Sequence, residues 1–127
     1  MSSHAIDPWV SAGSLEAPFY RFYTDAAGTT ELNELVLDPR KSYTFRRLNG
    51  ASSHPFYVTA VADPAGSAGS DNYSLSGDGS SAVGITGDQS FTLSFSDHTQ
   101  APPSLIAYCT AHPTMQSAWR ITRILTA

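Results

Sequence analysis

The sequence is poor in two kinds of side chain, cysteine and charged residues. Its 127 residues contain one cysteine, Cys109, so no disulfide can form within the chain. A single free thiol is either buried and inert or kept for chemistry. Charged residues make up 14% of the chain and hydrophobic residues 41%. This balance favours a compact fold with Ser/Thr/Gly-rich loops over a charged helical bundle.

Long apolar runs and a basic surface are also lacking. No hydrophobic run approaches the length of a membrane span, and the first ten residues, MSSHAIDPWV, lack the pattern of a signal peptide. The 7 Lys and Arg are outnumbered by 11 Asp and Glu, which gives a net charge of −4. This excess of negative charge argues against nucleic acid or an anionic membrane as the partner. We expect the short basic clusters Arg46-Arg47 and Arg120/Arg123 at solvated strand edges.

What the chain does contain is a series of short apolar runs with a period of two, rich in Phe, Tyr, Val, Ile and Thr. Such runs, separated by turn residues, are typical of strands. No segment has a sustained helical pattern, and ELNELVL (31–37) is expected to end as a strand before Asp38-Pro39. The sequence therefore predicts an all-β sandwich of seven or eight strands. The main predicted strands are 18–24, 42–48, 55–62, 90–96, 105–109 and 118–125.

Two segments depart from this pattern. Residues 66–87 are rich in Gly and Ser and low in apolar side chains. We interpret them as a surface excursion between core strands, because a single sandwich needs strands from both sides of it. Residues 1–16 are interpreted as an N-terminal arm able to dock on a neighbour, and 17–127 as one domain.

The side chains best suited to chemistry gather in CTAHPTM (109–115). Cys109 ends a predicted strand, and His112 and Met115 follow it at intervals of three in a loop that can aim them at one point. His54 lies just before another apolar strand and can supply a fourth ligand. One thiolate, two imidazoles and a weak thioether form the ligand set of a trigonal copper site with a long axial bond. Zinc is less favoured, because structural zinc sites are usually closed by four Cys or His ligands and Met is a poor zinc donor.

Each of these residues also has a structural interpretation. Cys109 can be a small core hydrophobe and Met115 a gap-filler, and His54, after two serines, can be a surface turn residue. The combination and spacing favour metal ligation over these separate roles. A thiol nucleophile at Cys109 with His112 as its base is weaker, because adjacent loop residues rarely reach that geometry together with a third orienting group. We therefore expect no enzyme.

In these residues the chain resembles the cupredoxin family. CTAHPTM has the Cys-x-x-His-x-x-Met spacing of amicyanin-like members, and HPFYVTAV opens a strand with His54 as the family does. The resemblance extends from LDPRKSYTF (37–45) to the C-terminus. It implies a Greek-key β-sandwich with one copper ion bound by His54, Cys109, His112 and Met115, and single-electron transfer through a solvent-facing His112.

The chain is also similar to cupredoxin-like modules of marine bacterial and phage structural proteins, which carry SHPF upstream and a Tyr-Cys-x-x-His-x-x-Met cluster near the end of the domain. Two functions follow from the resemblance. The first is a copper-binding protein with a mononuclear type 1-like site and a protein redox partner, expected in the periplasm. The second is a non-enzymatic structural module, such as a virion decoration or cement protein, bound to an assembly neighbour. An oligomer is compatible with both.

Overall fold

The computed structural model describes residues 3–4, 7–16, 19–32, 36–59, 73–80, 82–95, 104–112 and 114–121. These residues form strands and one short 3-10 turn, η1 (Leu48–Gly50), and no helix among them is long and apolar enough to cross a membrane. The predicted all-β class is confirmed. The strands are β1 (Ser3–His4), β2 (Trp9–Val10), β3 (Phe22–Tyr23), β4 (Val36–Leu37), β5 (Lys41–Arg47), β6 (Phe56–Thr59), β7 (Tyr73–Gly77), β8 (Ser90–Phe95), β9 (Ser104–Cys109) and β10 (Gln116–Ile121).

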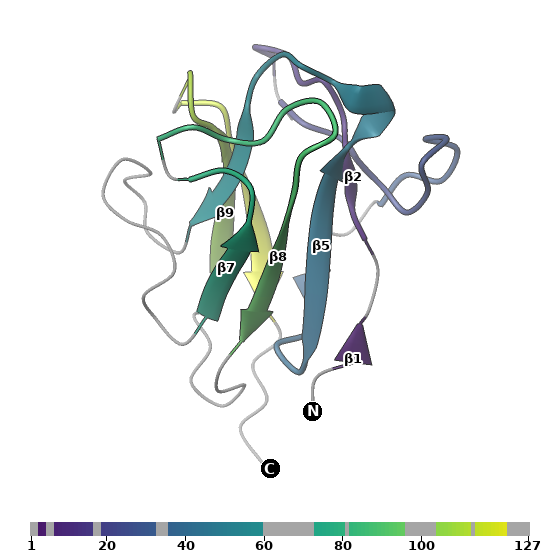
Figure 1. Cartoon of the computed structure of the whole chain (residues 1–127), viewed down its shortest axis with the longest axis vertical. Coiled ribbons are helices and arrows are strands. Elements are labelled where there is room, and N and C mark those ends of the chain that lie inside the picture. Colours follow the sequence, from purple (N-terminus) through teal and green to yellow (C-terminus); the bar gives the residue numbers. More distant parts are fainter. Residues whose placement is uncertain are drawn as a thin grey trace.

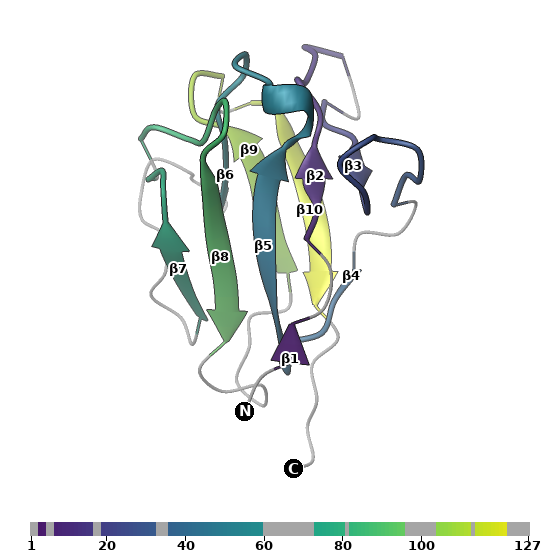
Figure 2. The same ribbon diagram turned by 45° about the vertical axis from the view of Figure 1, so that its right-hand side comes forward.

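The strands form two sheets that pack face to face. One sheet has the order β3-β2-β5-β8-β7, with β1 also paired to β5, and the other has the order β4-β10-β9-β6. Figure 2 shows the second sheet behind β5 and β8. Neighbours in a sheet are often distant in sequence, since β5 pairs with β8 and β6 with β9. The chain thus crosses between the sheets as Greek-key connections do, and the predicted sandwich is confirmed.

Most predicted strands form where the period-two pattern is strong. The six apolar runs supply β3, β5, β6, β8, β9 and β10, and the run at 31–37 ends in β4 as expected. Three further strands raise the number to ten within the described residues. Both β1 and β2 lie in the predicted arm (1–16) and pair with β5, while β7 lies in the predicted excursion (66–87) and pairs with β8. Residues 66–72 of that excursion lie outside the described part of the chain.

The core between the sheets is organised around Phe56, the first residue of β6, which is completely buried. Its ring centroid lies 5.1 Å from that of Tyr20, 5.8 Å from that of Phe22 and 5.6 Å from that of Phe45. Tilted and edge-to-face contacts at such distances add to the free energy gained by burial. They fix the start of β6, and with it the chain just upstream.

The loops that connect β5 to β6, β7 to β8 and β9 to β10 gather at one end of the sandwich (Figure 1). Gly84 lies where the second of these loops crosses the start of β6. Beside it, Phe56 and Ile85 exchange two backbone hydrogen bonds, of 3.2 and 2.9 Å. A Cβ atom on Gly84 would lie 2.5 Å from the backbone nitrogen of Phe56. Only glycine allows two backbone segments to approach this closely.

Replacing Gly84 by Ala should therefore force the two segments apart and lower the free energy of unfolding by about 1–3 kcal/mol. Urea unfolding of the metal-free protein measures this change. The neighbouring Val83→Ala is the control, because Val83 is exposed and surface truncations usually change stability by about 0.5 kcal/mol or less. Equal stability of the two variants would contradict the close approach.

Candidate metal centre

Strand pairing brings His54 to Cys109, although 55 residues separate them. Cys109 is the last residue of β9, and its register partner is Phe56, at the start of β6. The pairing continues beyond the strands, where the Thr110 N–H donates a 2.9 Å hydrogen bond to the Pro55 carbonyl. His54 directly precedes Pro55, so the two loops meet at the end of the same strand pair.

A tight turn after β9 brings His112 back to the same point. The His112 N–H donates to the Cys109 carbonyl (3.2 Å), and the Met115 N–H donates to the His112 carbonyl (2.9 Å). The Cys109 N–H in turn donates to the Met115 carbonyl (3.2 Å). Backbone hydrogen bonds among Cys109, His112 and Met115 thus close this segment into a tight loop.

These side chains form a compact donor cluster of one sulfur and two imidazoles. The Cys109 Sγ atom lies 3.8 Å from Nδ1 of His54 and 3.7 Å from Nδ1 of His112. One ligand atom from each residue lies within 4.8 Å of the other two. Metal bonds of about 2.3 Å to sulfur and about 2.0 Å to nitrogen, at an angle of about 120°, would place two ligand atoms about 3.7 Å apart. The cluster can therefore hold one metal ion.

The three ligand residues differ in their exposure. Cys109 is buried, His54 is partly buried and His112 is exposed, and the two imidazole centroids lie 5.2 Å apart. The sulfur is thus shielded from solvent oxidants, while the edge of one imidazole reaches the surface. A metal ion held here would be accessible from the side of His112.

Met115 is the fourth residue predicted as a ligand. Its side chain is buried in the core, and its backbone is hydrogen-bonded to both Cys109 and His112. The structure brings His54, Cys109 and His112 together as a donor group. Met115 adjoins this group along the turn, and its role as an axial ligand stays a prediction.

The backbone of His54 adopts an unusual conformation. Its φ of 50° is in the left-handed region, which residues with a side chain seldom occupy. Its carbonyl oxygen accepts two hydrogen bonds, from the Tyr20 hydroxyl at 2.7 Å and from Nη1 of Arg47 at 3.2 Å. Neither donor belongs to the predicted ligand set.

The prediction that Arg47 is solvated is wrong, since its side chain is only 2% exposed. Besides His54, its guanidinium donates to the carbonyls of Ile85 (2.8 Å), Ser11 (2.9 Å) and Ser53 (2.9 Å). Among the described residues, Nε of Arg47 is the buried side-chain polar atom without a partner. The buried guanidinium of Arg47 therefore connects three loops at the end of the sandwich that carries the donor cluster.

A signal for this burial was present in the sequence. Strand alternation places Arg47 on the same face as Tyr43 and Phe45, two core residues. Arg46 points the other way, is partly exposed, and pairs with Asp7. Arg46 and Arg47 carry the same charge, but Arg46 lies at the surface and Arg47 in the interior.

Burial changes the ionisation of both donors to His54. It lowers the pKa of Arg47, which the neighbouring Tyr20 and Cys109 partly counteract. Since the ordinary pKa of a guanidinium is far above neutral pH, Arg47 stays charged at neutral pH. Burial also raises the pKa of Tyr20, and Cys109 beside it acts in the same direction. Tyr20 therefore keeps its proton and stays a donor.

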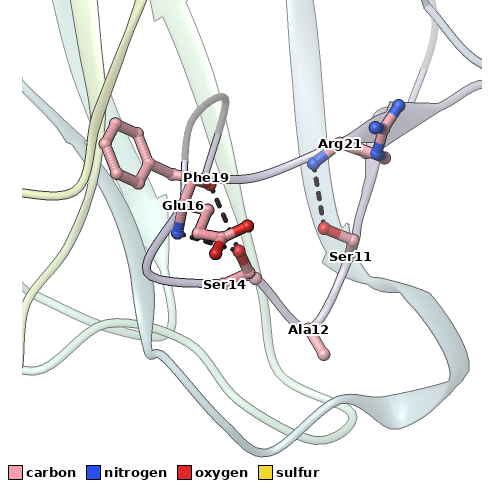
Figure 3. A pocket seen from close by; sticks show the side chains of 7 residues that line it. Ser11, Ala12, Ser14, Glu16, Phe19 and Arg21 are labelled. Carbon is pink, nitrogen blue, oxygen red and sulfur yellow. Dashed lines mark hydrogen bonds between the residues drawn. The ribbon is translucent and has the colours of Figure 1, made fainter.

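The loop between β2 and β3 covers the His54 side of the cluster. A Cβ atom on Gly13, whose φ is +89°, would lie 3.2 Å from the Cβ of His54 and 3.0 Å from the Tyr20 ring. The same loop lines an open hollow of about 370 Å³ beside Gly13 (Figure 3). No ligand residue of the cluster lines the hollow, which is therefore a separate feature. Its lining consists of Ser11, Ala12, Gly13, Ser14, Glu16, Phe19 and Arg21.

Comparisons of the chain with protein-family models, with curated proteins and with solved structures find no match.

If the cluster holds a metal ion, a soft divalent metal should stabilise the folded protein. With free Zn²⁺ at 100 times its dissociation constant, the gain is about 2.7 kcal/mol, measured by thermal unfolding with and without a chelator. His112→Gln should abolish most of this gain, while its exposure leaves the metal-free fold intact. Glu16→Gln, in the separate hollow, is the control. Equal stabilisation of all three proteins would show that zinc binds elsewhere.

Proposed function

We propose that the protein binds one copper ion in a mononuclear type 1-like site and transfers single electrons. The observation that carries this proposal is the distance from the Cys109 sulfur to the two histidine Nδ1 atoms, 3.8 and 3.7 Å. One thiolate and two imidazoles in a trigonal arrangement, with a weak axial thioether, are the ligands of such copper sites. Met115 is the proposed axial ligand, as the resemblance to cupredoxins implies.

Two features of the cluster suit electron transfer. Bound copper would supply the one-electron redox chemistry. The protein would hold the ligands in a fixed geometry and provide a path for electrons to reach the ion. The backbone bonds of the 109–115 turn and the pairing of β6 with β9 restrict ligand movement between the two oxidation states. The exposed imidazole of His112 gives a route between a buried sulfur and a partner at the surface.

The proposed partner is a redox protein that docks at the metal end of the sandwich. Within the described residues, the exposed large hydrophobic side chains are Leu15 and Val83. Val83 precedes Gly84, whose N–H donates to Oγ1 of Thr110 at 2.9 Å. Leu15 lies in the same loop as Gly13, where an added Cβ atom would lie 3.2 Å from the Cβ of His54. Both apolar side chains thus come from loops that touch the cluster, which suits a small, transient interface.

The alternative of a virion decoration or cement protein rests on the sequence likeness to structural modules and on the predicted N-terminal arm. Part of that arm is engaged within the fold, because β2 pairs with β3 and β5 of its own sheet. The donor cluster therefore supports the redox proposal more directly than any described feature supports assembly.

A Cu²⁺ titration of the metal-free protein should give an intense thiolate-to-copper absorption band that saturates at one equivalent. Cys109→Ser should lose the band, because the charge-transfer donor is the thiolate itself. Absence of the band from the unaltered protein would refute the proposal and leave the cluster as a packing motif.

Met115→Leu should keep this band while raising the reduction potential, because a weak axial thioether tunes the potential more than it holds the metal. Leucine also preserves the buried apolar volume at that position. Visible absorption and electrochemistry measure the two properties separately. Complete loss of copper binding in this variant would contradict the axial role.

A further inference from the structure

The backbone of His54 is held in a conformation that needs support from the surrounding structure. Its left-handed φ of 50° is costly for a residue with a side chain and persists only where the surrounding structure fixes it. Pro55 follows it, and the paired start of β6 comes next. The orientation of the His54 carbonyl is then fixed by hydrogen bonds from two buried donors.

The two donors reach the His54 carbonyl from different parts of the fold. The Tyr20 hydroxyl (2.7 Å) comes from the segment before β3, and Nη1 of Arg47 (3.2 Å) comes from the end of β5. Arg47 also binds the carbonyl of Ser53, the residue before His54, at 2.9 Å. The peptide groups on both sides of the His54 Cα are therefore restrained by these two buried side chains.

We infer that Arg47 and Tyr20 are positioning residues of the metal centre, which hold the His54 imidazole toward Cys109, and that the buried guanidinium favours the reduced state of a bound ion. This inference rests on the proposed function. Hydrogen-bond partners in the outer shell of a metal site commonly determine ligand orientation. Here the restraint acts on the ligand's backbone.

The effect on the reduction potential follows from charge. The oxidised ion carries one more positive charge than the reduced ion, so a nearby cation destabilises the oxidised form more. Arg47 lies one hydrogen bond from a ligand residue and is almost completely buried, and charges interact more strongly in such surroundings than in water. Removing the charge should lower the potential, whereas replacing Arg47 by Lys should change the potential little.

Three variants separate orientation from charge. Tyr20→Phe removes one hydrogen-bond donor and keeps the ring that packs on Phe56. Arg47→Lys keeps the positive charge and loses the planar guanidinium. Arg47→Met loses the charge and the guanidinium together. We expect each to weaken copper binding about 10–100-fold, measured by competition with a chelator. Only Arg47→Met should also lower the reduction potential. Arg46→Met is the control, because it removes the same charge from the opposite face of β5.

Thermal unfolding of the metal-free variants distinguishes weaker binding from loss of the fold, and Tyr20→Phe and Arg47→Lys carry the test if Arg47→Met does not fold. Unaltered copper affinity in these two variants would overturn the positioning role and leave the proposed function standing. An unaltered potential in folded Arg47→Met would overturn the electrostatic role. Failure of the wild-type protein to take up copper would overturn both the proposed function and this inference.

Discussion

The antiparallel pairing of β6 with β9 is the constraint on which the donor cluster depends. Phe56 lies opposite Cys109 in this register, and the Thr110-to-Pro55 hydrogen bond extends it past the strand ends. A shift of one residue would turn each side chain of a strand to the other face, and the sulfur would then face away from His54. The aromatic contacts of Phe56 oppose such a shift. The packing of the core therefore also determines where the side chains of the donor cluster lie.

A buried arginine at the end of β5 is the second element of this arrangement. Taking a guanidinium out of water is costly unless its donors are paired, and Arg47 offsets that cost with four carbonyl oxygens. Those carbonyls belong to residues outside the named strands, and among them the Ile85 carbonyl also accepts a backbone hydrogen bond from Phe56. The cation thus serves as the hydrogen-bonding centre of an end of the sandwich that strands alone would leave open.

The features that could be predicted from the sequence are those determined by neighbouring residues in the chain. The strong strands followed from alternating apolar residues, and the Cys109–His112 pair followed from spacing within one turn. β2 has only two residues and β7 reads YSLSG, so neither carries enough apolar side chains for a clear pattern. The contact of His54 with Cys109 depends on register across 55 residues; the place of His54 before an apolar strand and the family resemblance make it a candidate ligand, but neither gives that register. The burial of Arg47 follows from its position on the core face of β5, whereas its charge alone predicts exposure.

The two histidines are consequently held by different kinds of interaction. His112 lies in a turn that is closed by backbone hydrogen bonds among Cys109, His112 and Met115, so its position relative to Cys109 is largely a local property of the chain. His54 is held by Arg47, Tyr20 and the β6–β9 register, all of which exist only in the complete sandwich. Metal affinity is coupled to folding wherever ligands converge only in the native state. If the donor cluster holds a metal ion, this coupling acts through His54, and a lost core contact near Phe56 would weaken metal binding through this residue while the 109–115 turn stayed in place.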